Sequence, residues 1–516
     1  MVDTDNNSSP VRDFFRGKDI FITGGTGFLG MALIEKLLRV FPDVGTIYVL
    51  VRPKKGKEVS ARIEELTKNR VYDKLKELRG ENIFQKLVAV AGDVAEDNLG
   101  LSPADRNLLT QNVSIVFHSA ATLDFNVDLK SAISINLLGT QRVVQLCKDI
   151  SHLKALVHVS SAYVNSNRKG GAKEIVYPVP ENAEKVINVA AGLSDEVLLE
   201  LTPALLNDHP NTYTFTKALA EHEVVNAINQ VPSVIVRPSI ITCAWKEPVP
   251  GWINSKNGPS GFIMGAAKGV VRRLPANKKL IYDYIPVDIV INELIVAAWH
   301  VGTIRPHTTP VYHCTSSTTN PFQWSAVEHK IKENLHKYPL KSAVWYPTVK
   351  FLPSLLLFRI SAIFVHFIPA YILDTITRIV GGRPILVRLH TNVDKSLGQL
   401  APFIFNDWRF DNSQTKDLQK TLSGQDKDMF NLDISKLDWE DYFVDMIKGI
   451  RMYLNNEHPR TLPAAKRKDS ILMVLNLLTQ ALVFGFIWWI GSVALGTPMT
   501  KCSWIVVISY IIFSFL

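Results

Sequence analysis

Short apolar runs alternate with helical repeats through the first 240 residues of the chain. The runs at 18–23, 46–51, 87–91, 113–117, 155–159 and 234–237 have the length of buried strands, and apolar residues at helical spacing lie between them. Strands that alternate with helices predict an α/β fold with a doubly wound parallel sheet. Ligands of such sheets bind beyond the carboxyl ends of the strands.

The pattern changes in the C-terminal part of the chain, which we expect to be mainly helical. Residues 351–373 are very apolar but include Arg359, and a charged side chain at mid-span is costly in lipid. We therefore expect a groove or a membrane-surface element there rather than a true span. Residues 471–495 are almost uninterruptedly apolar and long enough to cross a bilayer, and a shorter apolar run follows at 503–516. The basic residues at 466–468 should remain on the cytosolic side.

These patterns divide the chain into four parts. Residues 1–13 are expected to be a flexible tail, because their polar start has no apolar signal core. Residues 14–350 would form the domain that contains the sheet, and residues 351–462 a second, mainly helical domain. Residues 469–516 would form a transmembrane anchor with one span and one short apolar segment.

A glycine-rich turn follows the first predicted strand. Residues 23–30 read Thr-Gly-Gly-Thr-Gly-Phe-Leu-Gly, which places Gly24, Gly27 and Gly30 three residues apart. Glycines at this spacing permit a tight turn, a close approach of the backbone to a pyrophosphate, and close packing of helix on strand. The N–H groups at the start of the following helix would face the anion. Between a strand and a helix, this turn predicts a dinucleotide site in a Rossmann-type fold.

The residue after the second predicted strand indicates which dinucleotide binds. An acidic residue there would hold the ribose 2′-hydroxyl of NAD, whereas Arg52 suits the 2′-phosphate of NADP. Asp93 follows the third predicted strand, where it either reaches the adenine amino group or forms a turn. The sequence therefore predicts NADPH rather than NADH.

Three Tyr-x-x-x-Lys pairs occur, and they begin at Tyr72, Tyr213 and Tyr346. Residues four apart share a helix face, and a nearby ammonium would lower the pKa of the tyrosine and make it a proton donor near neutral pH. Tyr213 and Lys217 form the pair that lies between the fifth and sixth strands, downstream of a serine pair at 160–161. Tyr213 is therefore predicted to be the catalytic tyrosine, and the other two pairs are not.

Composition narrows the class of ligand. The net charge of +9 suits phosphorylated ligands or an anionic membrane face. Nothing resembles a nucleic-acid recognition motif, so we expect no nucleic acid partner. The four cysteines are scattered without metal-binding spacing, which predicts no metal and suits a reducing, cytosol-facing compartment.

The motifs together resemble the extended short-chain dehydrogenase/reductase superfamily. The resemblance rests on the glycine-rich turn, Gly-Asp-Val at 92–94, His-Ser-Ala-Ala at 118–121, Val-Ser-Ser-Ala-Tyr at 159–163 and the Tyr213–Lys217 pair. Within it, the chain is similar to the alcohol-forming fatty acyl-CoA reductases. Their second-domain signature resembles Phe-Asn-Asp-Trp-Arg-Phe-Asp-Asn at 405–412 and Leu-Asp-Trp-Glu-Asp-Tyr at 437–442. The resemblance covers roughly residues 14–454, and an apolar tail is typical of animal members.

This resemblance implies NADPH-dependent reduction of a long-chain acyl-CoA to a primary alcohol through an aldehyde, with release of coenzyme A. It implies that Tyr213 donates the proton, that Lys217 holds the ribose and tunes Tyr213, and that Ser161 hydrogen-bonds the substrate carbonyl. Ser160 is the alternative to Ser161, because the two serines are adjacent. The residues expected to bind the cofactor are Thr23, Gly24, Gly25, Thr26, Gly27, Phe28, Leu29, Gly30, Arg52, Asp93, Val94, Ala120, Ala121, Tyr213, Lys217, Pro238 and Ile240.

The resemblance also implies an integral membrane protein of the endoplasmic reticulum or the peroxisome, with its catalytic domain facing the cytosol. Two alternatives remain at this point. One is another membrane-bound member of the superfamily, of the sterol dehydrogenase or sugar-nucleotide epimerase type. The other is a non-catalytic NADP-binding regulator, which would need no proton donor. No feature of the sequence sets the oligomeric state.

Overall fold

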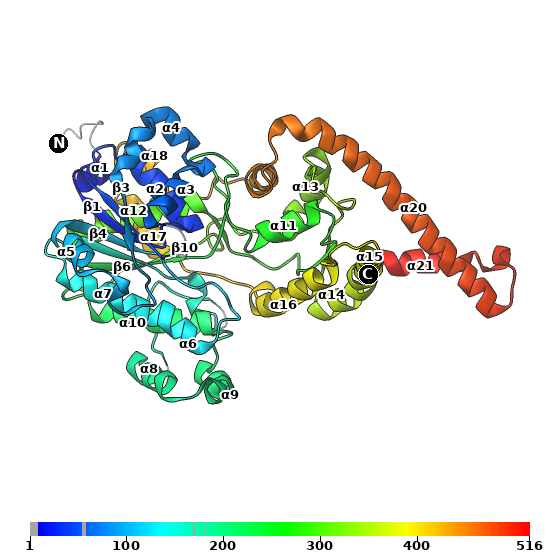
Figure 1. Cartoon of the computed structure of the whole chain (residues 1–516), viewed down its shortest axis with the longest axis horizontal. Coiled ribbons are helices and arrows are strands. Elements are labelled where there is room, and N and C mark those ends of the chain that lie inside the picture. Colours follow the sequence, from blue (N-terminus) through cyan, green and yellow to red (C-terminus); the bar gives the residue numbers. More distant parts are fainter. Residues whose placement is uncertain (1–8, 54–57, 169–170, 180, 516) are drawn as a thin grey trace. The chain divides into compact units, whose positions relative to one another are not determined.

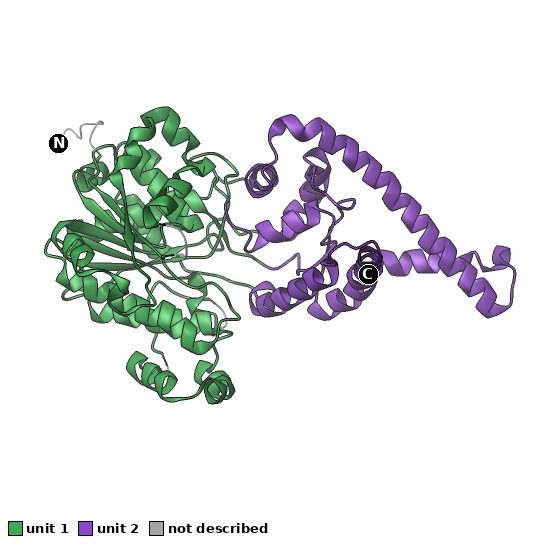
Figure 2. Cartoon of the chain, viewed as in Figure 1, with its two compact units in different colours: residues 1–253, 281–322, 407–437 green, residues 254–280, 323–406, 438–516 purple. Residues whose placement is uncertain are grey.

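Two compact units make up the computed structural model, which describes residues 9–53, 58–168, 171–179 and 181–515. Each unit is assembled from three segments of the chain (Figure 2). Unit 1 takes residues 1–253, 281–322 and 407–437, and unit 2 takes residues 254–280, 323–406 and 438–516. The units therefore differ from the expected division into contiguous domains at residue 350.

Unit 1 is built on a seven-stranded parallel sheet with the order β10-β6-β5-β4-β1-β2-β3 (Figure 1). The six predicted strands are confirmed, and β10 adds an edge. The strands are β1 Asp19–Thr23, β2 Ile47–Val51, β3 Leu87–Ala91, β4 Val113–His118, β5 Ala155–Val159, β6 Ser233–Pro238 and β10 Val311–Cys314. β1 pairs with β2 on one side and with β4 on the other, so the winding reverses there, and the carboxyl ends of these strands form the switch point at which such sheets bind ligands.

Helices cover both faces of this sheet (Figure 1). α2 (Phe28–Val40) packs with α12 (Val287–Ile304) on one face, and α7 (Gly139–Asp149) packs with α10 (Thr212–Asn226) on the other. α12 is long and apolar enough to cross a membrane, but 72% of it is buried inside the fold, so it is a core helix. The other helices of unit 1 are α1 Pro10–Phe15, α3 Val59–Thr67, α4 Asp73–Arg79, α5 Pro103–Asn112, α6 Leu129–Ala132, α8 Ala183–Gly192, α9 Asp195–Leu206, α17 Ser413–Lys420 and α18 Asp426–Met429, and β7 Ile240–Thr242 pairs with β9 Tyr284–Pro286.

The N-terminal part of the chain differs from the expected flexible tail. Residues 10–13 belong to α1, which Ser9 caps through its side chain and which buries Val11 and Phe15. Those two apolar side chains pack into the core, and this holds the helix on unit 1. Residues 1–8 of the expected tail lie outside the described residues.

The segment 407–437 was expected in the second domain but belongs to unit 1. The carboxylate of Glu174, which is buried in unit 1, connects this segment to the sheet. Glu174 accepts hydrogen bonds from the backbone N–H of His313 on β10, at 2.8 Å, and of Thr415 on α17, at 3.1 Å. These bonds attach the segment to the edge strand.

Unit 2 is mainly helical in its described residues. Residues 351–373, expected as one apolar element, comprise the end of β11, α14, a π-helical turn at Ile363–Phe367 and the start of α15. Arg359 on α14 pairs with Asp394 on α16, with Nε and Oδ1 3.0 Å apart. The elements of unit 2 are α11 Pro259–Ala267, α13 Trp324–Lys337, α14 Leu355–Ala362, α15 Ile368–Ile379, α16 Leu386–Ile404, α19 Trp439–Gly449, α20 Leu462–Leu495, α21 Trp504–Phe515, and the paired strands β8 Arg273–Pro275 and β11 Lys350–Leu352.

The predicted span at 471–495 lies within α20, which starts earlier than its apolar run. The first turns of α20 are packed in unit 2. Asp469 pairs with His336 at 3.0 Å, and Asn476 accepts a hydrogen bond from the indole of Trp345 at 3.0 Å. By length and composition, both Leu355–Ile379 and Pro459–Leu495 could cross a membrane.

Candidate functional site

The glycine-rich turn joins β1 to α2 at the sheet's switch point. Gly24 adopts a φ of +74°, and a Cβ on it would lie 2.8 Å from the backbone nitrogen of Ala120. A Cβ on Gly30 would lie 2.4 Å from the carbonyl oxygen of Gly24, so the absence of a side chain lets α2 pack against the turn. Gly27 is the N-cap of α2, and the first N–H groups of a helix lack partners within it. The turn therefore fits the pyrophosphate of a dinucleotide.

The end of β4 is hydrogen-bonded to the end of β1. The hydroxyl of Thr23 lies 2.7 Å from Nδ1 of His118 and accepts a hydrogen bond from the backbone N–H of Ala120 at 3.3 Å. Complete burial, with a smaller effect from Lys217, lowers the pKa of His118 to about 3, so the imidazole is neutral. These bonds hold the predicted Ala120–Ala121 stretch beside Gly24.

Arg52 and Asp93 lie together beyond the ends of β2 and β3. Nε of Arg52 is 2.7 Å from Oδ2 of Asp93, and a second guanidinium nitrogen is 3.2 Å from Oδ1. This two-point contact fixes the orientation of the guanidinium. The Arg52 side chain is still 62% exposed, so it retains access to an anionic ligand. The sequence predicted each residue separately but not their pairing.

Tyr213 lies in the first turn of α10, which begins there because Asn211 caps the helix by accepting the N–H of Thr214 at 2.9 Å. Its hydroxyl forms a hydrogen bond with Ser161, which lies just beyond β5. The neighbouring Ser160 hydroxyl is buried without a hydrogen-bond partner among the described residues. The structure therefore brings Tyr213 together with Ser161 rather than Ser160.

The expected lowering of the Tyr213 pKa by Lys217 is wrong. The Lys217 ammonium donates a hydrogen bond to the carbonyl oxygen of Val159 at 2.6 Å. Burial raises the pKa of Tyr213 to about 12, and the hydrogen bond with Ser161 offsets this only in part. Burial also lowers the pKa of Lys217 to about 8, against a smaller opposing effect of Glu221. Desolvation dominates at this position, so Tyr213 remains protonated at neutral pH.

Asn136 is a site residue that the sequence analysis missed. It lies in a π-helical turn, Ile133–Leu138, a distortion often found at functional sites. Its amide oxygen accepts the N–H of Thr122 at 3.0 Å, and its amide nitrogen donates to the hydroxyl of Thr216 at 3.1 Å. Asn136 thereby links the stretch after Ala121 to the helix that carries Tyr213. The signal available in the sequence was an asparagine among the apolar positions of a predicted helix.

The remaining predicted positions lie at the strand ends or outside the site. Pro238 ends β6 and Ile240 begins β7, while Val94 is buried after β3. Two tyrosines begin the other Tyr-x-x-x-Lys pairs. Tyr72 is buried and donates a hydrogen bond to the Met31 carbonyl at 3.3 Å, and Tyr346 stacks on His336 in unit 2. Across the part of the chain that is described, no group of three or more His, Cys, Asp or Glu side chains could hold a metal ion.

Comparisons with known proteins cover both halves of the chain. An NAD-binding family model described as "Male sterility protein" matches residues 22–294, and a second model with the same description matches residues 365–457. The chain is 51% identical to the Drosophila melanogaster protein CG8306, whose name assigns it provisionally to the fatty acyl-CoA reductases, over 99% of this chain and 100% of that protein. It is 37% identical to fatty acyl-CoA reductase 1 of Xenopus laevis, over 93% and 92% of the two chains.

Solved structures share the fold at low sequence identity. The terminal R domain of the myxalamid PKS-NRPS biosynthetic pathway is 19% identical with a TM-score of 0.55, over 84% of this chain and 90% of that one. A thiolation-reductase di-domain of an archaeal non-ribosomal peptide synthetase is 14% identical with a TM-score of 0.50, over 87% and 80%. Together with the family models and the full-length relatives, these findings show that the chain is a nicotinamide-cofactor-binding member of the fatty acyl-CoA reductase family, within the extended short-chain dehydrogenase/reductase superfamily.

Proposed function

We propose that this chain reduces long-chain fatty acyl-CoA to the primary alcohol with NADPH, through an aldehyde and with release of coenzyme A. Relatives that carry the name of this activity match over more than nine-tenths of the chain and support the reaction type. The observation that carries the proposal is the grouping of Ser161, Tyr213 and Lys217 at the same sheet edge as the glycine-rich turn. A protein that only bound the dinucleotide would not need a buried proton donor there.

Bound NADPH would supply the hydride to the carbonyl carbon of the substrate. Tyr213 is assigned as the acid: its protonated hydroxyl meets the carbonyl oxygen and donates the proton as negative charge develops. Ser161 donates a hydrogen bond to the same oxygen and orients the tyrosine. Lys217 holds the ribose and is positioned for this by its bond to Val159. These transfers would give a hemithioacetal. Return of its hydroxyl proton to Tyr213 and expulsion of the coenzyme A thiolate would leave the aldehyde, and a second NADPH would reduce the aldehyde in the same site, again with Tyr213 as the acid, to give the alcohol.

The preference for NADPH over NADH is assigned to Arg52. A guanidinium matches the geometry and charge of a 2′-phosphate, and its exposed position beyond β2 is where that phosphate belongs in this fold. The contact with Asp93 supports the role, because it limits the orientations of a long side chain and lowers the entropic cost of binding.

We further assign α20 as a membrane anchor, with unit 1 in the cytosol at the endoplasmic reticulum or peroxisome. The length and apolar composition of α20 support this, and so does the run of basic residues at 466–468 that precedes its apolar part. The four cysteines are free, which suits a reducing compartment.

Product analysis tests the proposed reaction. Membranes that contain the protein would be incubated with NADPH and a ladder of acyl-CoAs, and the lipids analysed by gas chromatography. We expect primary alcohols and free coenzyme A, with NADH a poor substitute. An isomerised product with the cofactor returned unchanged would instead indicate an epimerase. NADPH binding without oxidation that depends on acyl-CoA would indicate a regulator.

A further inference from the structure

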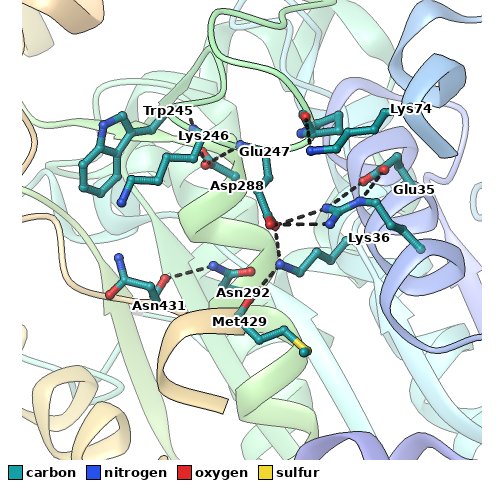
Figure 3. A network of polar contacts seen from close by, with 12 residues as sticks. Glu35, Lys36, Lys74, Trp245, Lys246, Glu247, Asp288, Asn292, Met429 and Asn431 are labelled. Carbon is teal, nitrogen blue, oxygen red and sulfur yellow. Dashed lines mark hydrogen bonds and ion pairs between the residues drawn. The ribbon is translucent and has the colours of Figure 1, made fainter. Parts of the chain in front are cut away.

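A partly buried cluster of charges joins distant segments of unit 1 on α2 (Figure 3); its lysine is buried, and its central carboxylate, that of Glu247, is 34% exposed. Lys36 and Arg39 lie on this helix, and both pair with the carboxylate of Glu247 from the loop after β7; Arg39 Nη2 is 3.1 Å from Oε2. Lys36 also donates to the carbonyl oxygen of Met429, at the end of α18, at 2.7 Å. Arg39 pairs with Glu35 at 2.7 Å. The cluster therefore connects α2, the loop and the segment 407–437.

Removing charges from water costs free energy, so we explain this cluster by the geometry that it fixes and not by added stability. The Lys36 side chain is 4% exposed and that of Glu35 is 1% exposed. Apolar residues of similar size would stabilise such a position as well or better, whereas a buried charge accepts only partners in a defined arrangement. A charged cluster here indicates that the loop must be held in one place.

The loop at 244–252 is fixed at its base and along its first half. At the base, the N–H of Ala244 donates to the carbonyl oxygen of Trp252 at 2.9 Å. Along its first half, the carboxylate of Asp288 at the start of α12 accepts three consecutive backbone N–H groups, from residues 245–247, at 2.8, 2.8 and 3.1 Å (Figure 3). The loop is thus rigid where Glu247 reaches α2.

Trp252 connects this loop to the glycine-rich turn. Its ring centroid lies 5.2 Å from that of Phe28, the first residue of α2, and the indole is 1% exposed. The backbone N–H of Phe28 belongs to the first turn of α2, which faces the expected pyrophosphate position. A shift of the loop would therefore move the Trp252 ring and release Phe28.

We propose that Glu247 is a positioning residue for the dinucleotide: through Lys36 and Arg39 it holds the 244–252 loop on α2, and through Trp252 it fixes the first turn of α2 around the pyrophosphate. This inference rests on the proposed placement of the cofactor at the glycine-rich turn. It concerns cofactor affinity rather than proton transfer, because Tyr213 lies on α10.

The first test is Glu247→Gln in the full-length, detergent-solubilised protein. The substitution keeps the shape of the side chain and removes its charge. We expect the Kd and the KM for NADPH to rise about tenfold, while kcat at saturating NADPH changes less than twofold. The control is Asp417→Asn, which removes an exposed ion pair with Lys420 in the same unit and should leave Kd, KM and kcat unchanged. An unchanged Kd in Glu247→Gln overturns the proposal.

A second variant separates positioning from stability. Glu247→Gln leaves the buried Lys36 ammonium without the negative charge that Glu247 supplied, which lowers stability. In Lys36→Met/Glu247→Gln both charges are gone, so the melting temperature should recover while NADPH affinity stays low. Recovery of both would show a purely structural role and overturn the proposal. Gly24→Ala checks the premise: if it leaves NADPH affinity intact, the cofactor lies elsewhere and the proposed site fails. If it weakens binding while Glu247→Gln does not, the inference alone fails.

Discussion

Replacement of Tyr213 by phenylalanine tests the assigned chemistry with a small structural change. The variant keeps the buried ring and removes one hydroxyl, which forms a hydrogen bond with Ser161. Loss of that bond should cost about 1 kcal/mol of folding free energy. Ser161 keeps its bond from the Tyr163 N–H at 3.2 Å, so the local fold should persist.

The effect on catalysis should be larger than the effect on stability. Removal of a general acid typically costs a factor of about 10² to 10⁴ in rate. A hundredfold loss corresponds to about 2.7 kcal/mol of transition-state stabilisation. Because the substitution leaves the glycine-rich turn, Arg52 and Lys217 unchanged, most of the expected cofactor contacts remain and the Kd for NADPH should change little.

The assay measures alcohol and aldehyde formation from acyl-CoA together with NADPH binding. Tyr72→Phe is the matched control, because Tyr72 is also a buried tyrosine with a hydrogen-bonded hydroxyl followed four residues later by lysine. It should retain near-normal turnover once any loss of stability is taken into account. Full activity of Tyr213→Phe in a folded protein would refute the assignment of the acid, and equal losses in both variants would show that the effect is structural.

Three further predictions follow from the site and the anchor. Arg52→Asp should raise the KM for NADPH and relax or reverse the preference over NADH, and an unchanged ratio of the two activities would contradict the role of Arg52. Burial lowers the pKa of Lys217 to about 8, so kcat/KM should fall above about pH 8 as its ammonium is lost. Between about pH 8 and its ordinary pKa of 10.5, Lys217 is protonated in the unfolded chain but not in the folded one, so its contribution to the free energy of unfolding should rise with pH. A flat pH–activity profile through this range would contradict the need for the ammonium. Deletion of residues 478–516 keeps the contacts of Asp469 and Asn476. The truncated protein should be released from membranes by a carbonate wash and should still reduce short, soluble acyl-CoAs. Resistance to the wash would place a second membrane element in unit 2.

The strand, glycine turn and helix of the site could be predicted because they are local in sequence. Turn glycines at fixed spacing constrain only their own neighbourhood, and Gly24 and Gly30 make the close approaches that the spacing implies. Tyr213 could be distinguished from Tyr72 and Tyr346, which begin the other Tyr-x-x-x-Lys pairs, by its place in the alternation of strands and helices.

The features that could not be predicted from the sequence depend on contacts between distant segments. The ion pair of Arg52 with Asp93 and the bond of Glu174 with Thr415 join residues that no local pattern relates. The pKa of Tyr213 was predicted in the wrong direction because the sequence shows a neighbouring lysine but not the depth of burial. The same limitation hid the attachment of segment 407–437 to the sheet.

The most direct test of the proposed reaction is the fate of the transferred hydride. The full-length protein would be supplied with a long-chain acyl-CoA and with NADPH carrying deuterium at the transferable C4 position, and the alcohol analysed by mass spectrometry. Two reductions in one site predict an alcohol with two deuterium atoms on its hydroxyl-bearing carbon and two NADPH oxidised per coenzyme A released. An aldehyde with one deuterium as the only product, or no product labelled at that carbon, would contradict the proposed two-step reduction.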